Sequence, residues 1–333
     1  MTLIHLWIGL VGLVVMLYVA LDGFSLGVAI LFPSARKEDE QDILMNAIAP
    51  VWDANQTWIV FGGGALFAVF PRIYTVLFSA LYIPLLTFVF GLIFRGVSLE
   101  LRADTNQKTF WNRAFFFGSV IATFAQGITL GAYISGVTTV NGMFAGGAFD
   151  WLNPFSVMVG LALIAGYALL GSTYLIMKTT GHVQDRAYRQ AFWAALIVAG
   201  FMILVSIWTP FHDPEIPARW FSKPRIFFVW LFPLLGLFSF FMLIKSIKQR
   251  QKAEVRPFIF SLLLFLSAYL GLQTAIFPYA IPRNITIYEA AAQFETMVFT
   301  LWGVAIVIPV VLGYIIYSYW IFRGKVDTSE GYH

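Results

Sequence analysis

Long apolar segments separated by short polar stretches restrict the fold of this chain more than any other feature of its sequence. A helix needs about 20 apolar residues to cross a bilayer, and lipid offers no hydrogen-bond partners to the backbone of an open strand or loop. The sequence therefore predicts an all-α, polytopic transmembrane bundle of about nine helices. Their expected spans are 4–31, 50–69, 74–97, 113–137, 155–178, 190–210, 226–246, 258–279 and 293–321.

The composition agrees with a membrane protein and argues against a soluble one. Only 11% of the 333 residues are charged and 59% are hydrophobic, whereas soluble domains have about 25% charged residues. No polar stretch is long enough for a second domain, so residues 1–333 are expected to form one membrane domain surrounded by lipid. The net charge of +4 lies in short loops and does not indicate a nucleic-acid partner.

The basic residues predict how the bundle is oriented. The first apolar segment lacks a basic leader and is too long for the core of a signal peptide, so it is expected to remain as a helix. Sixteen of the 21 Lys and Arg residues, among them Arg36, Lys248 and Arg323, fall on one side of the predicted membrane. The positive-inside rule then places the N-terminus and His212 outside and the C-terminus in the cytoplasm.

Two acidic residues are candidates for chemistry because ionisable groups inside a bilayer are costly. Asp22 lies in the predicted span 4–31, in its cytoplasmic half, and Asp53 lies at the cytoplasmic start of 50–69. Both could handle protons, and the neighbouring Asn55 and Gln56 could hold water beside Asp53. Alternatively, Asp53 complements the positive end of its helix, and Asp22 accepts hydrogen bonds from a neighbouring helix.

Two further motifs favour structural roles. Glu100 and Arg102, at the end of the span 74–97, are expected to form a solvated ion pair. The run Gly62–Gly64 lies inside an apolar segment and is expected to allow close packing of a neighbouring helix.

The four histidines argue against a haem held by this chain alone. His5 lies at the outer end of the first span, His182 and His212 lie in loops, and His333 is the last residue. A haem in a membrane bundle generally needs an axial ligand such as histidine from a helix, and none of these lies mid-helix. The absence of cysteine also excludes thiolate metal sites, and we expect no metal or cofactor bound by this chain.

Several sequence motifs resemble subunit II of the cytochrome bd family of quinol oxidases, and the resemblance covers nearly the whole chain. The matching runs are Asp22–Gly27, Asn46–Trp58, Gly63–Ala68, Phe70–Pro71, Phe94–Arg95, Leu152–Phe155, Phe277–Pro278 and Ile281–Pro282. They are most specific in the first two spans. One departure is Ser25, where many members carry a second acid in an Asp-Gly-Phe-Asp motif.

This resemblance implies a function. Members of the family pair with a subunit I that carries haems b and d and oxidises quinol, and the complex reduces dioxygen to water in the bacterial cytoplasmic membrane. A small single-helix accessory subunit is a further candidate partner. The motif match gives Asp53 a part in cytoplasmic proton uptake, with Trp52 and Gln56 beside it and Asp22 as a second member of the path.

A proton-coupled secondary transporter that uses Asp22 and Asp53 is the alternative. Transporters tend to show inverted repeats with broken helices in both halves. We find no such repeat, and both acids lie in the N-terminal third of the chain.

Overall fold

The computed structural model describes residues 1–212, 229–250 and 254–326. Most of the predicted loop 211–225 and His333 lie outside these residues. In the described part, eight helices are long and apolar enough to cross a membrane. They are α1 (Thr2–Leu31), α5 (Tyr82–Leu101), α6 (Lys108–Ser135), α7 (Pro154–Lys178), α8 (Gly181–His212), α11 (Leu231–Lys248), α12 (Arg256–Ile276) and α14 (Phe294–Ile321).

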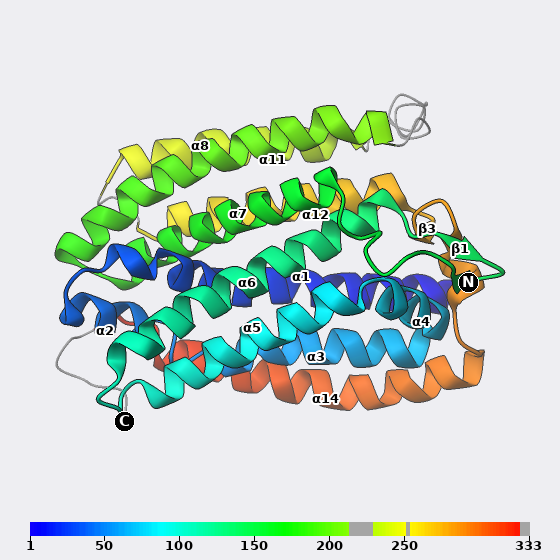
Figure 1. Ribbon diagram of the computed structural model, residues 1–333, viewed down its shortest axis with the longest axis horizontal. Helices are drawn as coiled ribbons and strands as arrows, with labels where there is room; N and C mark the ends of the chain where they lie inside the picture. The colour runs from blue at the N-terminus through cyan, green and yellow to red at the C-terminus, as the bar shows by residue number, and fades with distance from the viewer. Residues whose placement is uncertain (213–228, 251–253, 327–333) are drawn as a thin grey trace.

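These helices run side by side along the long axis of the molecule (Figure 1). Helices α1, α6 and α7 form the centre, where α1 contacts both α6 and α7. On one side α8 packs on α7 and α11 packs on α12, and on the other side α3 (Trp52–Val69) lies between α1 and α14. Helix α3 corresponds to the predicted span 50–69 but is less apolar, because its first turns carry Asp53, Asn55 and Gln56. The predicted helical bundle is confirmed, with a count close to nine.

The predicted span 74–97 is wrong as one continuous helix. The structure has a short helix α4 (Pro71–Ala80) that ends before α5 begins at Tyr82. Pro84 explains the break, because its ring would clash with the carbonyl of Ala80 and it has no N–H to donate there. The Leu81 backbone leaves the helical region, with φ −115° and ψ 16°.

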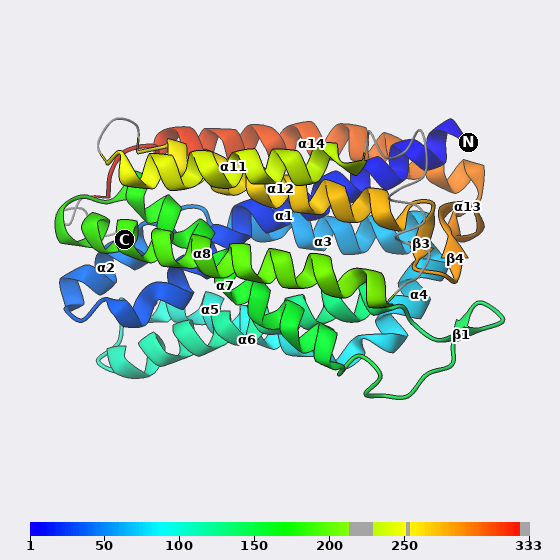
Figure 2. The same cartoon turned by 90° about the horizontal axis from the view of Figure 1, so that it is seen from above.

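Short elements close the two ends of the bundle. At one end, a 3₁₀ turn (Phe32–Ser34) leads into α2 (Glu38–Asn46). At the other end lie α4, the hairpin of β1 (Thr139–Val140) and β2 (Met143–Phe144), the hairpin of β3 (Tyr279–Ile281) and β4 (Ile285–Thr286), and α13 (Ile287–Ala290) (Figure 2). Sequence reasoning treated all of these segments as loops or helix ends.

The end that carries α2 is also the basic end of the molecule. Arg36 precedes α2, Lys248 ends α11, and Arg323 follows α14, so all three lie there. Arg72 of α4 and Arg283 between β3 and β4 lie at the opposite end. The basic residues that the sequence assigns to opposite sides of the membrane thus lie at opposite ends of the bundle.

The closest helix crossing joins α1 to α7 and requires two glycines. A Cβ atom on Gly27 would lie 1.8 Å from the Tyr167 carbonyl oxygen, and one on Gly171 would lie 2.3 Å from the Gly27 carbonyl carbon. The run Gly62–Gly64, expected to pack closely, does so only weakly. A Cβ atom on Gly62 would lie 3.3 Å from Val14 of α1, whereas one on Gly63 or Gly64 would meet no described atom within 4 Å. Within the described part of the chain, the close approach is therefore limited to Gly62.

A C-terminal clasp, formed by Phe322–Val326, holds the chain end against the α7–α8 turn. Lys178, the last residue of α7, donates its ammonium group to the carbonyls of Phe322 and Gly324. In return its own carbonyl accepts from the Val326 N–H at 2.8 Å. Lys325 donates to the Thr179 carbonyl at 2.8 Å. Four hydrogen bonds between sequence-distant residues therefore join the two segments at the basic end.

Candidate functional site

A buried ion pair lies inside the bundle between α1 and α5. Arg95 Nη1 donates to Asp22 Oδ1 at 2.7 Å, and both side chains are 0% exposed. Asp22 is about 13 Å from the end of α1 and Arg95 about 9 Å from the end of α5, at 1.5 Å per residue. Each charge stabilises the other, because either one alone would be an unpaired charge in the apolar interior, which is costly.

A polar cluster that includes residues of two other helices, α3 and α14, lies beside this pair. The Arg95 guanidinium lies 5.7 Å from the ring centre of Trp52, the first residue of α3. One turn deeper, Asn55 donates to the Leu21 carbonyl at 2.8 Å and to the Ser25 hydroxyl at 3.2 Å. Its own carbonyl oxygen accepts from the Tyr319 hydroxyl of α14 at 2.9 Å. Asn55 thus joins α3 to α1 and α14 beside Asp22.

Several buried polar atoms around the cluster have no hydrogen-bond partner among the described residues. They include Nε and Nη2 of Arg95, Nε2 of Gln56 and the hydroxyls of Ser119 and Thr123 on α6. Buried polar groups are normally paired with protein or with ordered water. Ordered water is the remaining kind of partner for such groups.

Asp53 lies apart from the buried pair. It is exposed in the first turn of α3, at the basic end of the bundle, and no side chain caps this helix. Gln56 follows it by three residues and is half-buried. No hydrogen bond or ion pair among the described residues joins Asp53 to Asp22, so the predicted pair of acids comprises one surface group and one buried group.

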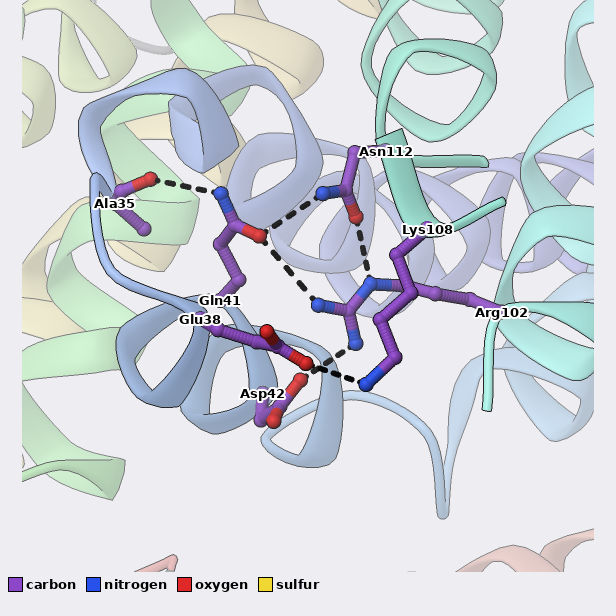
Figure 3. Close-up of polar contacts among 7 residues, drawn as sticks. All are labelled: Ala35, Glu38, Gln41, Asp42, Arg102, Lys108 and Asn112. Carbon is purple, nitrogen blue, oxygen red and sulfur yellow. Dashed lines mark hydrogen bonds and ion pairs between the residues drawn. The ribbon is translucent and has the colours of Figure 1, made fainter. Parts of the chain in front are cut away.

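Arg102 is not paired with Glu100 as predicted. It is 5% exposed and donates to Asp42 of α2 at 2.5 Å and to Asn112 of α6 at 2.6 Å (Figure 3). Gln41 completes the cluster by accepting from Asn112 at 2.9 Å. Glu100 is exposed. The pairing was missed because α2 is a separate polar helix folded back over α5 and α6.

A second ion pair at the edge of the same cluster joins Lys108 to Glu38. The hydrogen bond from Lys108 holds the pKa of Glu38 below its usual value. Both side chains are largely exposed, so the pair contributes little to stability.

The described histidines lie at the two ends of the bundle. His5 bonds with the Tyr288 hydroxyl at 2.9 Å at one end of the bundle, and His182 lies exposed at the start of α8 at the other end. His212 ends α8, and its side chain lies outside the described part, as does His333. Among the described residues, no histidine lies in the apolar middle of the bundle.

Comparison with known proteins decides the family. Residues 3–322 match the family described as cytochrome bd terminal oxidase subunit II. The chain belongs to this family. Cytochrome bd-I ubiquinol oxidase subunit 2 of Escherichia coli strain K12 is 27% identical over 365 residues, which cover 98% of this chain and 95% of that protein. Cytochrome bd ubiquinol oxidase subunit 2 of Bacillus subtilis is 31% identical over 191 residues, 56% of each chain.

The fold of a solved relative agrees with this subunit II assignment. A chain of the bd oxidase from Geobacillus thermodenitrificans superposes with a TM-score of 0.78 at 18% identity, over 96% of this chain and 97% of that one. The chain is therefore a multi-span subunit of a cytochrome bd oxidase, a haem-containing oxidoreductase complex with at least one further subunit. The transporter alternative finds no support.

Within this subunit II, sequence reasoning missed Arg95 as the partner of Asp22. It counted Arg95 among the basic residues that flank a loop, because the predicted helix ended two residues later. The structure extends α5 to Leu101 and buries Arg95 completely. A signal was present, since an arginine inside an apolar span requires an acidic partner and Asp22 is the acid at a comparable depth.

Proposed function

We propose that this chain is the haem-free subunit of a bacterial quinol oxidase and that it conducts protons from the cytoplasm toward a haem-bearing partner. The proposal is carried by the placement of the exposed Asp53 and the buried Asp22–Arg95 pair at the start of α3, where Asn55 contacts α1 beside Asp22. Quinol is the substrate class because the E. coli and B. subtilis relatives are named ubiquinol oxidase subunits. Haems b and d belong to the partner, because the histidines described here lie at the bundle ends.

The path has three steps along α3. Asp53 takes up a proton at the surface, and its carboxylate exchanges with water. Gln56, whose amide nitrogen has no partner, holds water one turn deeper. Asn55 and Ser25 then lead to Asp22, whose second oxygen Oδ2 makes no hydrogen bond to Arg95. Ser25 replaces an acid found in many relatives, and its hydroxyl can both donate and accept a proton.

Trp52 and Arg95 shape the inner end of this path. The Trp52 indole covers the Arg95 guanidinium and keeps it facing Asp22. The Arg95 guanidinium compensates the Asp22 carboxylate, which would otherwise be an unpaired buried charge. A small single-helix accessory subunit completes the proposed complex.

The first test concerns haem and its location. The complex purified from its native membrane through a tag on this chain is expected to show haem bands in its visible spectrum. The same chain expressed and folded without its partner is expected to be colourless. One equivalent of haem retained by the isolated chain would contradict the proposal and direct attention to His5. A colourless native preparation would contradict membership of an active oxidase complex.

The second test concerns orientation, with the N-terminus outside and the C-terminus in the cytoplasm. Single cysteines can be placed at Arg36, Lys248 and Arg323, since the chain has none of its own. Because these sites lie at the basic end, a membrane-impermeant maleimide is expected to label them only after the cells are opened. A cysteine at Arg72 should react in intact cells. Labelling of the Lys248 position from outside would reverse the proposed orientation.

A further inference from the structure

A groove of about 440 Å³ opens between α7 and α8 toward the basic end of the bundle. One wall is a single face of α8, and the opposite wall is formed by Ala165 and Ala168 of α7, with Leu31 at the end of α1. The volume lies within the range of about 300–1,000 Å³ typical of small-molecule sites. The small alanine side chains create the space, because a larger residue at either position would fill it.

The α8 wall changes from polar to apolar along the bundle axis. Arg186, Arg189 and Gln190 line the groove toward the basic end, and Trp193 and Ile197 line it one and two turns deeper than Arg189. The uncharged stretch 191–208 that begins here is about 27 Å long, close to the hydrocarbon thickness of about 30 Å. Arg189 therefore lies at the level of the lipid headgroups. Trp193, 64% exposed, lies where tryptophan commonly anchors a membrane protein.

One of the two arginines in the groove is already neutralised. Arg186 pairs with Glu40 of α2 at 2.9 Å and donates to the Ser34 carbonyl at 2.5 Å. Although burial raises the pKa of Glu40, its hydrogen bond to Arg186 brings that pKa below its usual value. Glu40 therefore stays ionised at neutral pH, and this arginine offers no net charge to a ligand.

Two neighbouring cations are not neutralised. Arg189 is exposed and makes no ion pair or hydrogen bond among the described residues. Lys248 lies 6.0 Å from the ring centre of Phe192, next to the groove on α8, and likewise has no acidic partner in the described part of the chain. Arg250 is already paired with Asp185 at 3.0 Å. The mouth of the groove therefore has excess positive charge.

We propose that this groove binds one anionic phospholipid from the membrane leaflet at the basic end. The phosphate contacts Arg189 and the Gln190 amide, with Lys248 adding to the local positive potential. One acyl chain lies along Trp193 against the alanines of α7. Charge complementarity and the match of polarity to membrane depth select a lipid, since a helix of a partner protein would not need the cationic mouth.

The test uses the purified, haem-containing complex in native mass spectrometry, with dioleoyl phosphatidylglycerol or dioleoyl phosphatidylethanolamine added at equal concentrations. The wild-type complex is expected to retain more phosphatidylglycerol. Arg189→Gln is expected to reduce the affinity of the complex for phosphatidylglycerol at one site by about fivefold, as removal of one interfacial cation implies. Ala168→Phe should fill the acyl slot and remove that site for both lipids. Unchanged haem spectra show that the variants have assembled.

Arg113→Gln provides the matched control, because Arg113 is an exposed arginine of α6 outside the groove. It should leave lipid binding at the wild-type level. A photoreactive phosphatidylglycerol should in addition label the peptide that contains Trp193. Equal retention of the two lipids by the wild-type complex would overturn the anionic site. Unchanged phosphatidylglycerol binding in both Arg189→Gln and Ala168→Phe would overturn the groove as its location.

Discussion

Replacing Arg95 by leucine is expected to prevent most of the chain from assembling into a stable complex. The substitution leaves the Asp22 carboxylate fully buried and without its partner at 2.7 Å. Breaking a buried pair by removing one member costs about 3–5 kcal/mol, a large part of the typical 5–15 kcal/mol stability of a domain. The yield of haem-containing complex and its midpoint of thermal inactivation measure the effect.

The double variant Asp22→Leu/Arg95→Leu separates charge burial from function. Removing both charges eliminates the unpaired group, so assembly should recover well beyond either single variant. If Asp22 also relays protons, the recovered complex should still turn over slowly. Exposed Arg113→Gln is the control and should assemble normally. Equal loss of assembly in the single and double variants would show that packing rather than charge pairing holds this part of the bundle.

Asp53→Asn is expected to lower quinol oxidase turnover severalfold or more while the haem content stays near wild type. Asparagine keeps the size and hydrogen-bonding capacity of the side chain but removes the exchangeable carboxyl at the start of the path. Asp53 is exposed and accepts no capping hydrogen bond, so the structural loss is limited to its interaction with the helix end. That interaction is worth about 0.3–1 kcal/mol.

Asp53→Glu should retain more activity than Asp53→Asn, since it restores a titratable group. Glu100→Gln is the matched control, because it removes an exposed acid from the end of another helix, α5. Oxygen consumption by the purified complex and the haem-to-protein ratio are measured together. Parallel loss of haem and activity would indicate a structural helix-end role. Full turnover in Asp53→Asn would remove Asp53 from the proton path.

The fold was largely predictable from sequence because membrane helices obey a single strong constraint. Apolar length alone located eight of the spans, with boundaries mostly within a few residues of the structure. The rule failed at Pro84, where a steric effect interrupts an apolar run without changing its hydropathy. It was also silent on α2, which is polar and lies outside the membrane.

The candidate site was only partly predictable. Asp22 and Asp53 stand out because acids are rare in apolar segments, and their roles remain predictions. What sequence could not provide was pairing across the bundle: Asp22 with Arg95 on α5, and Asn55 with Tyr319, 264 positions away. Hydropathy describes each helix against lipid, whereas these contacts depend on which helices become neighbours and on the rotation of each about its axis.

The C-terminal clasp sets a time order on biogenesis. Lys178 and its acceptor Gly324 are 146 positions apart, and ribosomes add about 5–20 residues per second. The carbonyl groups that accept from the Lys178 ammonium group are therefore synthesised about 7–30 s after Lys178 itself. During that interval, the Lys178 ammonium group at the α7–α8 turn must donate its hydrogen bonds to water or to other proteins. The clasp can close only after α14 and the residues that follow it have been translated, so it forms late in synthesis.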